Sequence, residues 1–357
     1  MLKFILQRLF SGLFVLLGVI VIIFFLLNII PVDSGRLTLG ANADEETLAA
    51  VRKELRLDYS ATQRLWFYIS DISPLSINEL ENVEKPLYLD ASRNSYFKVL
   101  SIGTKALVLK KPNFGRSFQS NKSVSEIISR KILPTALLAT TSMFFATIIG
   151  ILFGVIAALN YNKALDKFTV AFAVLGISIP SYFSAIILAI SFGYYLSSYT
   201  GLNVTGSLIE VSDYGEYFIN WKNLILPTIA LGIRPIAIIV QLTRNSMLDV
   251  MNSDYVRTAK AKGLSKYVVI FKHTLRNALN PVVTSVTGWF ASLLAGAFFV
   301  EWIFDFKGLG HTTVSALLNF DFPLVMGSIL FIAMVFIVVN ILVDILYSLL
   351  DPRIRVE

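Results

Sequence analysis

The stretch DYVRTAKAKGLSKYVVIFKHTLRNALNP, residues 254–281, combines a dense run of positive charge with a glycine that separates two helical patterns. Ser253 or Asp254 is placed to cap a short helix that ends at Gly263, because glycine most readily adopts the left-handed backbone that follows a helix. A second helix is predicted beyond the glycine, leading into an apolar segment near Asn280. Its apolar positions recur at helical spacing: Val268, Val269, Phe271 and Leu275. The pattern predicts a compact knob of helix, glycine break and helix.

The chain as a whole is more apolar than a soluble globular domain. Of its 357 residues, 55% are hydrophobic and 15% are charged, and the mean hydropathy is +0.68. Such a composition is typical of an integral membrane protein. A helix needs roughly 20 apolar residues to cross the hydrocarbon core of a bilayer. Six spans of sufficient length are predicted, at residues 9–32, 132–162, 168–197, 223–243, 277–300 and 322–343.

The distribution of positive charge predicts the orientation, since Lys and Arg in short loops favour the cytoplasmic side. Residues 244–276 carry seven basic residues against two acidic ones, so this loop is predicted to be cytoplasmic. Six spans then place both termini in the cytoplasm as well. Residues 31–131 hold fifteen basic and twelve acidic residues and fall outside. This is compatible with the rule, because loops longer than about 60 residues cross largely regardless of charge.

The predicted fold class is therefore an all-α membrane protein with six transmembrane helices, cytoplasmic termini and a large external loop subdomain between spans 1 and 2. Residues 1–31 form an N-terminal tail and first span, and residues 32–131 form the external subdomain. Residues 132–357 form a five-span core that contains the basic loop 244–278. The first span is predicted to be retained, because its apolar run is too long for a secretory signal.

Two local structures are predicted inside the external subdomain. Residues 42–58, NADEETLAAVRKELRLD, favour a short amphipathic helix with Asp44 as its N-cap. Leu48, Val51 and Leu55 lie on one face of that helix. The alternating stretches KPLYLD at 85–90 and YFKVLSI at 96–102 favour a hairpin.

Arg234 is the clearest charge inside a predicted span. With Arg244 near the inner interface, ten residues at about 1.5 Å each place Arg234 about 15 Å deeper, close to the bilayer midplane. A charge at that depth is costly, so it should face protein or a pore. Two interpretations remain open for Arg234. It either lines the pore and attracts a carboxylate, or it forms a buried ion pair with Glu301, Asp305 or Asp344.

Nothing in the sequence predicts catalysis by this chain. No glycine is followed directly by lysine, so the phosphate-binding G-x-x-x-x-G-K-[ST] loop is absent from the sequence. His273 and His311 lie far apart without a metal-ligand pattern, and the chain has no cysteine. No catalytic residue, metal site or cofactor is predicted.

The charge of the knob alone leaves two interpretations open. A basic loop can set the topology and meet anionic lipid, or it can serve as a handle for a second protein. The order of residues favours the second interpretation, since small Ala259 and Ala261 precede a hinge glycine and an amphipathic helix. Such a compact shape suits a protein groove.

Seven stretches of the chain, taken in their order along the sequence, resemble the membrane-spanning permease subunits of ATP-binding-cassette importers of the dipeptide and oligopeptide type. The stretch 254–284 is similar to the coupling motif of that type. The broader importer class has Glu-Ala-Ala six residues before the glycine, whereas this sequence has Arg257, Thr258 and Ala259, a departure that the peptide-type subgroup shares. The other stretches are RLFSGLFVLLGVIVIIFFLLNIIP (8–31), NFGRSF (113–118), LPTALLAT (133–140), GISIPSYF (176–183), FVEWIFDFKGLG (299–310) and DILYSLLDPRIR (344–355). Residues 71–110 look like an insertion.

The resemblance implies that the knob is a coupling helix that docks on a cytoplasmic ATPase. The residues implied in coupling are Asp254, Tyr255, Arg257, Thr258, Ala259, Ala261, Gly263 and Leu264. The region of Glu301, Gly308 and Gly310 lines the external side of the gate in the resembled family, so these residues join Arg234 as pore or gate candidates.

The implied protein is the translocation-pathway subunit of an ATP-driven importer of di- or oligopeptides in the bacterial cytoplasmic (inner) membrane. It would work by alternating access with cytoplasmic ATP-binding subunits, a second homologous permease subunit and an external substrate-binding protein, in contact with membrane lipid. Nucleic acid is not an expected partner, because the positive surplus lies in predicted cytoplasmic loops. The alternative is an ion-gradient-driven secondary transporter or channel that acts without an ATPase.

Overall fold

The computed structural model of the chain describes residues 2–29, 52–53, 56–83, 85–89, 96–212 and 214–350. It divides into two compact units. Unit 1 contains Met1, Lys131–Thr312 and Val335–Glu357, and unit 2 contains Leu2–Arg130 and Thr313–Met334. The cap and the apolar face of the predicted amphipathic helix over residues 42–58 lie outside the described residues, as do residues 351–355 of the stretch DILYSLLDPRIR.

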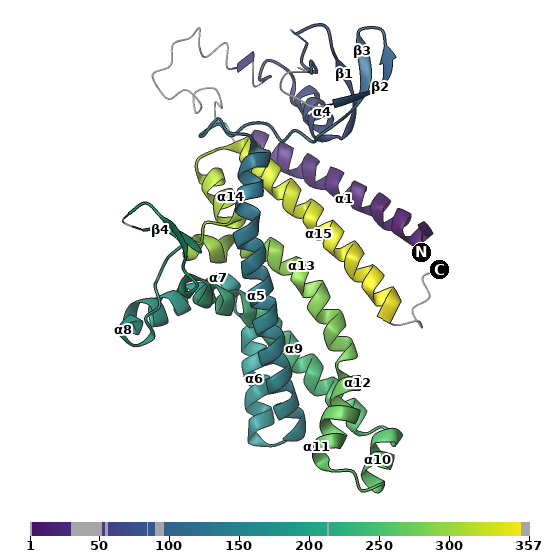
Figure 1. The fold of residues 1–357 in the computed structure, drawn as a ribbon, viewed down its shortest axis with the longest axis vertical. Coiled ribbons are helices and arrows are strands. Elements are labelled where there is room, and N and C mark those ends of the chain that lie inside the picture. The colour runs from purple at the N-terminus through teal and green to yellow at the C-terminus, as the bar shows by residue number, and fades with distance from the viewer. Residues whose placement is uncertain are drawn as a thin grey trace. The chain divides into compact units, whose positions relative to one another are not determined.

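Five helices of the described chain are long and apolar enough to cross a membrane (Figure 1). They are α1 (Leu2–Ile29), α5 (Val124–Leu159), α9 (Lys222–Met251), α13 (Asn280–Ile303) and α15 (Phe322–Leu350). The 36 residues of α5 extend over about 54 Å, which exceeds the roughly 30 Å hydrocarbon core. The helix begins eight residues before the predicted span because its polar first turns, through Lys131, are also helical.

The predicted third span is not one continuous helix. It is a bent pair, α6 (Ala164–Ser178) and α7 (Ser181–Leu188) continued by the π-helical turn η1 (Ala189–Tyr195), with an angle of 107° between the two arms. Pro180 is the cause, because a proline disfavours the helical conformation of the residue before it, and Ile179 has extended backbone angles. The described residues therefore hold five candidate spans, or up to six if the bent pair is counted as one.

The all-α prediction is corrected by a small sheet between the first two candidate spans. Its strands are β1 (Leu75–Glu79), β2 (Tyr96–Ile102) and β3 (Lys105–Lys110), antiparallel in the order β1-β3-β2. The stretch YFKVLSI forms β2 and turns into β3 through Gly103, whose φ of +60° suits a glycine. KPLYLD forms no strand and contributes one isolated bridge, between Tyr88 and Glu79. A second, two-stranded ladder joins β4 (Ile209–Val211) and β5 (Tyr217–Ile219).

Unit 2 is organised around the sheet and around α4 (Ala61–Ile72). Ser60 and Gln63 form a reciprocal capping box at the start of α4. The NFGRSF stretch is held by Asp321, whose carboxylate accepts the Ser117 hydroxyl at 2.5 Å and the Phe118 amide at 3.0 Å. Two segments 200 residues apart in sequence are thereby joined within this unit.

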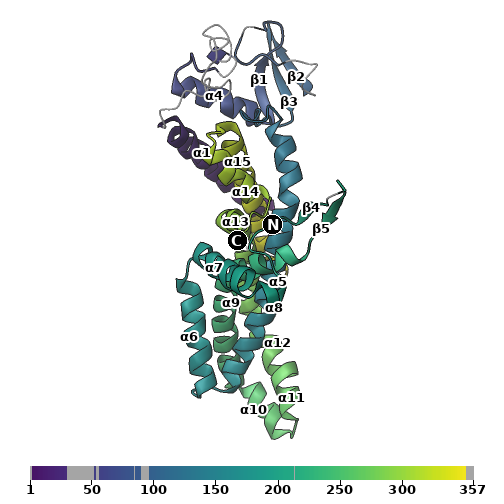
Figure 2. The same cartoon turned by 90° about the vertical axis from the view of Figure 1, so that its left-hand side faces the viewer.

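Unit 1 packs α5, α6, α7 and α13 around α9, in which 13 residues are buried. α6 and α9 lie side by side in both views (Figures 1 and 2). The contact between α5 and α9 is closest at Gly150 and Gly154. A Cβ at Gly150 would lie 2.6 Å from Ile239 Cγ2, and one at Gly154 would lie 2.5 Å from Thr243 Cβ. The two glycines, one turn apart, therefore allow the helix backbones to approach closely.

This contact yields a stability prediction for a pair of glycine-to-alanine variants. Gly154→Ala should lower the thermal midpoint of the detergent-solubilised chain, because overpacking costs about 1–3 kcal/mol and exceeds the roughly 1 kcal/mol gained in helix propensity. Gly288→Ala on α13 is the control, since nothing lies within 4 Å of a Cβ there. Differential scanning fluorimetry measures both. Equal midpoints for the two variants would contradict the packing role of Gly154.

Candidate functional site

The knob, defined here as residues 253–278, has the helix, glycine and helix order that the sequence predicts. Helix α10 spans Asp254–Ala261 with Ser253 as its N-cap. The Ser253 side chain does not cap the helix but donates to the Val250 carbonyl at 2.6 Å. Gly263 follows the helix with φ +76°, which confirms the predicted left-handed position.

The second helical run of the knob contains a turn that the sequence did not predict. α11 (Lys266–Val268) continues through the π-helical turn η2 (Val269–Leu275) into α12 (Arg276–Ala278). Ser265 caps its start by accepting the Val268 amide. The hydroxyl of Thr274 donates to the Val269 carbonyl at 3.0 Å, five residues back, and the side chain is fully buried. The wider turn therefore accommodates a buried polar group that has its own partner.

A small apolar core fixes the two helical runs against each other. Val256 and Ala259 of α10 and Val269 of η2 are all buried, with partly buried Val250 of α9 beside them. The Asn277 amide also donates to the Tyr255 hydroxyl at 3.0 Å. The knob is therefore a packed body attached to the end of α9.

The outer surface of the knob carries most of the predicted coupling residues. Seven of the eight are exposed, and only Ala259 is buried. The exposed seven are Asp254, Tyr255, Arg257, Thr258, Ala261, Gly263 and Leu264. The same surface also presents Tyr267 and Phe271, whose rings lie 4.5 Å apart. The site is an exposed aromatic and apolar patch bordered by basic side chains, and the α10–α11 region lies at one end of unit 1 (Figure 1).

At the other end of α13, Glu301 holds the turn into α14 (Leu309–Leu318). Its side chain is fully buried, and its Oε2 accepts the His311 amide at 2.9 Å. The hydroxyl of Thr135 on α5 accepts the Leu309 amide at 2.8 Å. These oxygens satisfy amides at the start of a helix, where no intrahelical acceptor exists. Glu301 therefore has a structural contact, whatever further role it has at a gate.

Gly308 and Gly310 allow Glu301 to come close to this turn. A Cβ at Gly308 would lie 2.6 Å from Glu301 Oε2 and 2.5 Å from Thr135 Oγ1. A Cβ at Gly310 would lie 2.8 Å from the Phe298 Cα. Any side chain at either position would displace the carboxylate or the backbone of α13.

Asp305 and His311 form a second contact across the same turn. His311 Nε2 lies 2.9 Å from Asp305 Oδ1, and the His311 ring lies 5.0 Å from that of Trp302. Asp305 has φ +50° and also lies 3.8 Å from the Lys307 ammonium. Burial lowers the pKa of His311, and the Asp305 carboxylate opposes this shift.

Arg234 forms no ion pair within 4.0 Å with any described residue, so the pairing expected with Glu301, Asp305 or Asp344 is not formed within this chain. Its side chain is exposed on α9, beside buried Pro235. The four pore and gate candidates do not form one cluster, since Glu301, Gly308 and Gly310 lie together at the turn into α14, whereas Arg234 lies on α9 and forms no ion pair with Glu301.

The sequence did not single out Asp166, which forms the most enclosed ion pair of the described part of unit 1. Its carboxylate accepts both Arg244 Nε at 2.5 Å and Arg244 Nη2 at 2.8 Å. The amide of Asn162 donates to the same carboxylate at 2.9 Å. An acid at the start of a span, 78 positions from its partner, gives no local pattern that identifies the pair.

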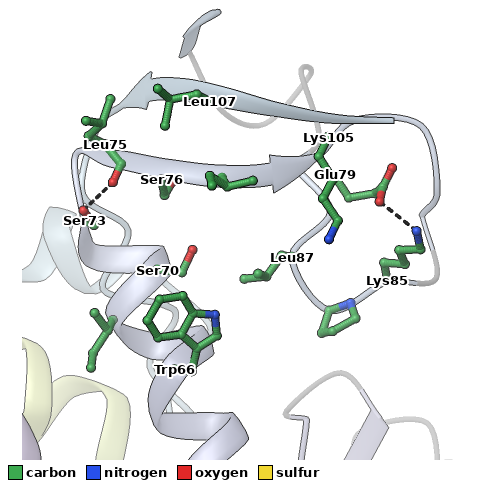
Figure 3. A pocket seen from close by; sticks show the side chains of 13 residues that line it. Trp66, Ser70, Ser73, Leu75, Ser76, Glu79, Lys85, Leu87, Lys105 and Leu107 are labelled. Atoms are coloured by element: carbon green, nitrogen blue, oxygen red, sulfur yellow. Dashed lines mark hydrogen bonds and ion pairs between the residues drawn. The ribbon is translucent and has the colours of Figure 1, made fainter. Parts of the chain in front are cut away.

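Unit 2 contains a separate cavity of about 600 Å³ between α4 and the sheet (Figure 3). Its walls are mostly apolar and include Trp66, Leu87 and Leu107. At one edge the Lys85 ammonium donates to Glu79 Oε2 at 2.8 Å, and this hydrogen bond lowers the pKa of Glu79. None of the predicted coupling or gate residues lines this cavity. Among the described residues, no group of three or more His, Cys, Asp or Glu side chains could hold a metal ion.

The fold and the knob together define a polytopic membrane protein with an exposed, packed loop between two long apolar helices. Residues 150–356 match the family described as binding-protein-dependent transport system inner membrane component, and residues 1–87 match the N-terminal region described for such membrane components. The chain belongs to this family of inner membrane permease components.

Two transport proteins match almost the whole chain. The glutathione transport system permease protein GsiC of Salmonella typhimurium strain LT2 is 32% identical over 355 residues, which cover 99% of each chain. The protein of the same name from Escherichia coli strain K12 has the same identity and coverage. Among solved structures, inward-facing conformations of the MetNI methionine ABC transporter cover 64% of this chain and 97% of theirs, with a TM-score of 0.51 and 16% identity. That likeness shows a shared fold.

These findings confirm the function predicted from the motifs. The chain is a permease subunit of an ABC importer and a multi-pass protein of the bacterial inner membrane. ATP is hydrolysed on partner subunits, so the chain itself is not an enzyme. A binding-protein-dependent transporter of this kind works with ATPase subunits and a substrate-binding protein.

The close contact at Gly308 gives a testable consequence. Gly308→Ala should move Glu301 off the amides of the turn and leave a buried carboxylate poorly satisfied, a cost of about 1–3 kcal/mol. Limited proteolysis at residues 304–312 and the thermal midpoint both measure this loss. Gly296→Ala is the control, because nothing lies within 4 Å of a Cβ at that position. A variant as protected as the control would show that Glu301 does not hold the turn.

The lowered pKa of His311 predicts a pH dependence of stability. As the pH falls through the ordinary histidine value of about 6.5, the unfolded chain takes up a proton before the folded chain does. Stability is therefore lost from that pH down to the folded pKa. Between about pH 7.5 and about pH 5.5 the thermal midpoint of the unaltered chain should fall further than that of His311→Gln. Equal decreases in the two proteins would contradict the assignment.

Proposed function

We propose that the chain is the translocation-pathway subunit for short peptides, and that its knob is the docking site for a partner ATPase. The observation that carries this proposal is the exposed surface of the knob around Tyr255 and Leu264, bordered by Arg257 and mounted on a buried core. Exposed aromatic and aliphatic side chains next to cations are typical of protein-binding surfaces. A rigid body at the end of α9 is suited to transmit a displacement rather than absorb it.

The proposed topology has six spans, with the bent pair α6–α7 counted as one, and both termini in the cytoplasm. In this arrangement residues 1–31 are the tail and first span, residues 32–131 lie outside, and residues 132–357 form the core with the coupling loop 244–278. Seven basic residues in 244–276 support a cytoplasmic knob. The turn that contains Glu301 then faces the outside, because α13 separates it from the knob by 24 residues or about 36 Å.

The substrate class follows from the relatives. GsiC is named for glutathione transport, and glutathione is a short peptide, so we propose di- or oligopeptides of this size for the present chain. Arg234 is exposed and unpaired among the described residues, so it is available to face the pathway and attract a peptide carboxylate. The pathway itself is completed by a second homologous permease subunit, with lipid around the pair and no nucleic acid partner.

The composition of the complex is the first test. The tagged chain is purified gently from its native membrane, and its companions are identified by mass spectrometry. Recovery of ATPases with the phosphate-binding loop and of a second permease supports the proposal. Uptake of radiolabelled glutathione into proteoliposomes then tests the substrate class. Recovery of the chain alone, as an oligomer that moves solute without ATP, would overturn the proposal.

Gly263 supplies a sharper prediction about the knob. Its φ of +76° is costly for any other residue, by about 1–2 kcal/mol, although nothing in the chain lies within 4 Å of a Cβ there. Gly263→Leu should therefore leave membrane insertion intact and reduce transport per ATP hydrolysed, by about tenfold or more.

Gly103→Leu is the matched control, because Gly103 has φ +60° and an equally open surrounding, but lies in the β2–β3 turn. The control should transport at the level of the unaltered chain. If Gly263→Leu transports as much solute per ATP hydrolysed as the unaltered chain, the knob does not couple ATP hydrolysis to transport.

A further inference from the structure

The pair of Asp166 and Arg244 joins the first turn of α6 to α9, the helix that carries the knob. Asp166 lies in the first turn of α6 and its side chain is 3% exposed, whereas the side chain of Arg244 on α9 is 18% exposed. The guanidinium donates through Nε and Nη2 to the two carboxylate oxygens, at 2.5 Å and 2.8 Å. The Arg244 guanidinium also lies over the Tyr161 ring, 5.4 Å from its centroid. The Arg244 guanidinium thus has a second contact, with the Tyr161 ring, and the Asp166 carboxylate has one with the backbone amide of Asn162.

A two-pronged contact of this kind restricts orientation as well as distance. Two parallel hydrogen bonds between a planar guanidinium and a planar carboxylate fix the angle between the groups. The backbone amide of Asn162 also donates to the Asp166 Oδ2, and Asn162 itself has φ +63° in the tight turn before α6. α6 therefore cannot slide or rotate on α9 at this end without breaking the pair.

The position of Arg244 places this link next to the knob. α9 ends at Met251, seven residues or about two turns after Arg244, and α10 begins at Asp254. Val250, in the last turn of α9, packs against the buried core of the knob. A displacement of the knob therefore reaches Arg244 through a short length of continuous helix.

The other end of α6 leads into the bend. α6 turns by 107° into α7 at Pro180, and α7 packs against both α9 and α13. The first turn of α6 is bonded to α9, and the last turn of α6 leads into α7. A displacement of α9 is therefore passed through α6 to α7. Both helices of the bent pair lie in the part of the chain that matches the permease family.

We propose that Asp166 and Arg244 are positioning residues that form the rigid link between the knob and the α6–α7 bend. When the knob moves with its partner, the pair stays closed and α6 moves with α9, so that α7 changes its place in the pathway. This inference rests on the proposed docking of an ATPase at the knob. The inference adds to the proposed function that the bent pair α6–α7 is the part of the permease to which a displacement of the knob is transmitted.

The test uses the full complex, with its partner ATPases, in proteoliposomes. Because the chain has no cysteine, Tyr182→Cys at the start of α7 provides a single labelling site within this chain, which gel electrophoresis separates from the partner subunits, and the Tyr182 side chain is 49% exposed. The rate of maleimide labelling is compared without nucleotide and with ATP plus vanadate. Asp166→Asn should remove this nucleotide-dependent difference while ATPase co-purification and basal ATP hydrolysis persist.

Three further variants separate a link from a merely stabilising contact. The exchange Asp166→Arg with Arg244→Asp should restore at least part of the labelling difference. Arg244→Lys retains the positive charge but cannot donate two parallel hydrogen bonds to the carboxylate. It should give a nucleotide-dependent difference in labelling rate between those of the unaltered chain and Asp166→Asn. Glu126→Gln is the control, since it removes a pair with Arg130 whose side chains are 47% and 71% exposed, and it should change nothing.

The outcomes distinguish this inference from the proposed function. An unchanged labelling difference in both Asp166→Asn and Arg244→Lys would overturn the link. Loss of ATPase co-purification in every Asp166 and Arg244 variant, without recovery in the exchanged protein, would also overturn it and assign the pair to folding alone. Absence of ATPases from the unaltered complex would instead refute the proposed docking at the knob.

Discussion

The close approach of α5 to α9 at Gly150 and Gly154 is the contact on which the rest of unit 1 depends. Between helices in a membrane, lipid is as apolar as a leucine side chain, so close packing of small residues supplies much of the attraction. The two glycines bring the α5 backbone against Ile239 and Thr243. α9 is thereby held against α5 at Ile239 and Thr243, and its last turns, which carry Arg244 and the knob, continue this packing through buried Met247.

The buried acids of this unit lie at helix ends, where they accept hydrogen bonds from backbone amides or from a charged side chain. Glu301 and Thr135 accept the amides at the start of α14, and Asp166 accepts the amide of Asn162 together with Arg244. A helix end buried in protein leaves up to four amides without partners, and each unsatisfied group is costly in an apolar surrounding. The acids are therefore explained as structural partners first. A gating role for Glu301 would have to act through the same contacts.

The knob could be predicted from the sequence because its determinants are local. Gly263 follows a short amphipathic helix, and the left-handed backbone at that position is a property of glycine itself. The ends of the spans were predicted less well, since the polar first turns of α5 continue the helix beyond the uncharged run. The bend in the third span was missed, although Pro180 was a visible signal, because hydrophobicity alone does not distinguish one long helix from two short ones.

The ion pair of Asp166 and Arg244 could not be predicted, for a different reason. Pairing across 78 positions depends on how α6 packs on α9, and no pattern within either segment reports that packing. The seven basic residues of 244–276 give a single topological signal in the sequence, and nothing local distinguishes Arg244 from the others. Arg244 is held in a two-pronged bond, whereas Arg257, on the knob, is 70% exposed. One run of positive charge thus contains two physical roles. The exposed charges border the outer surface of the knob, and the enclosed charge joins α9 to α6.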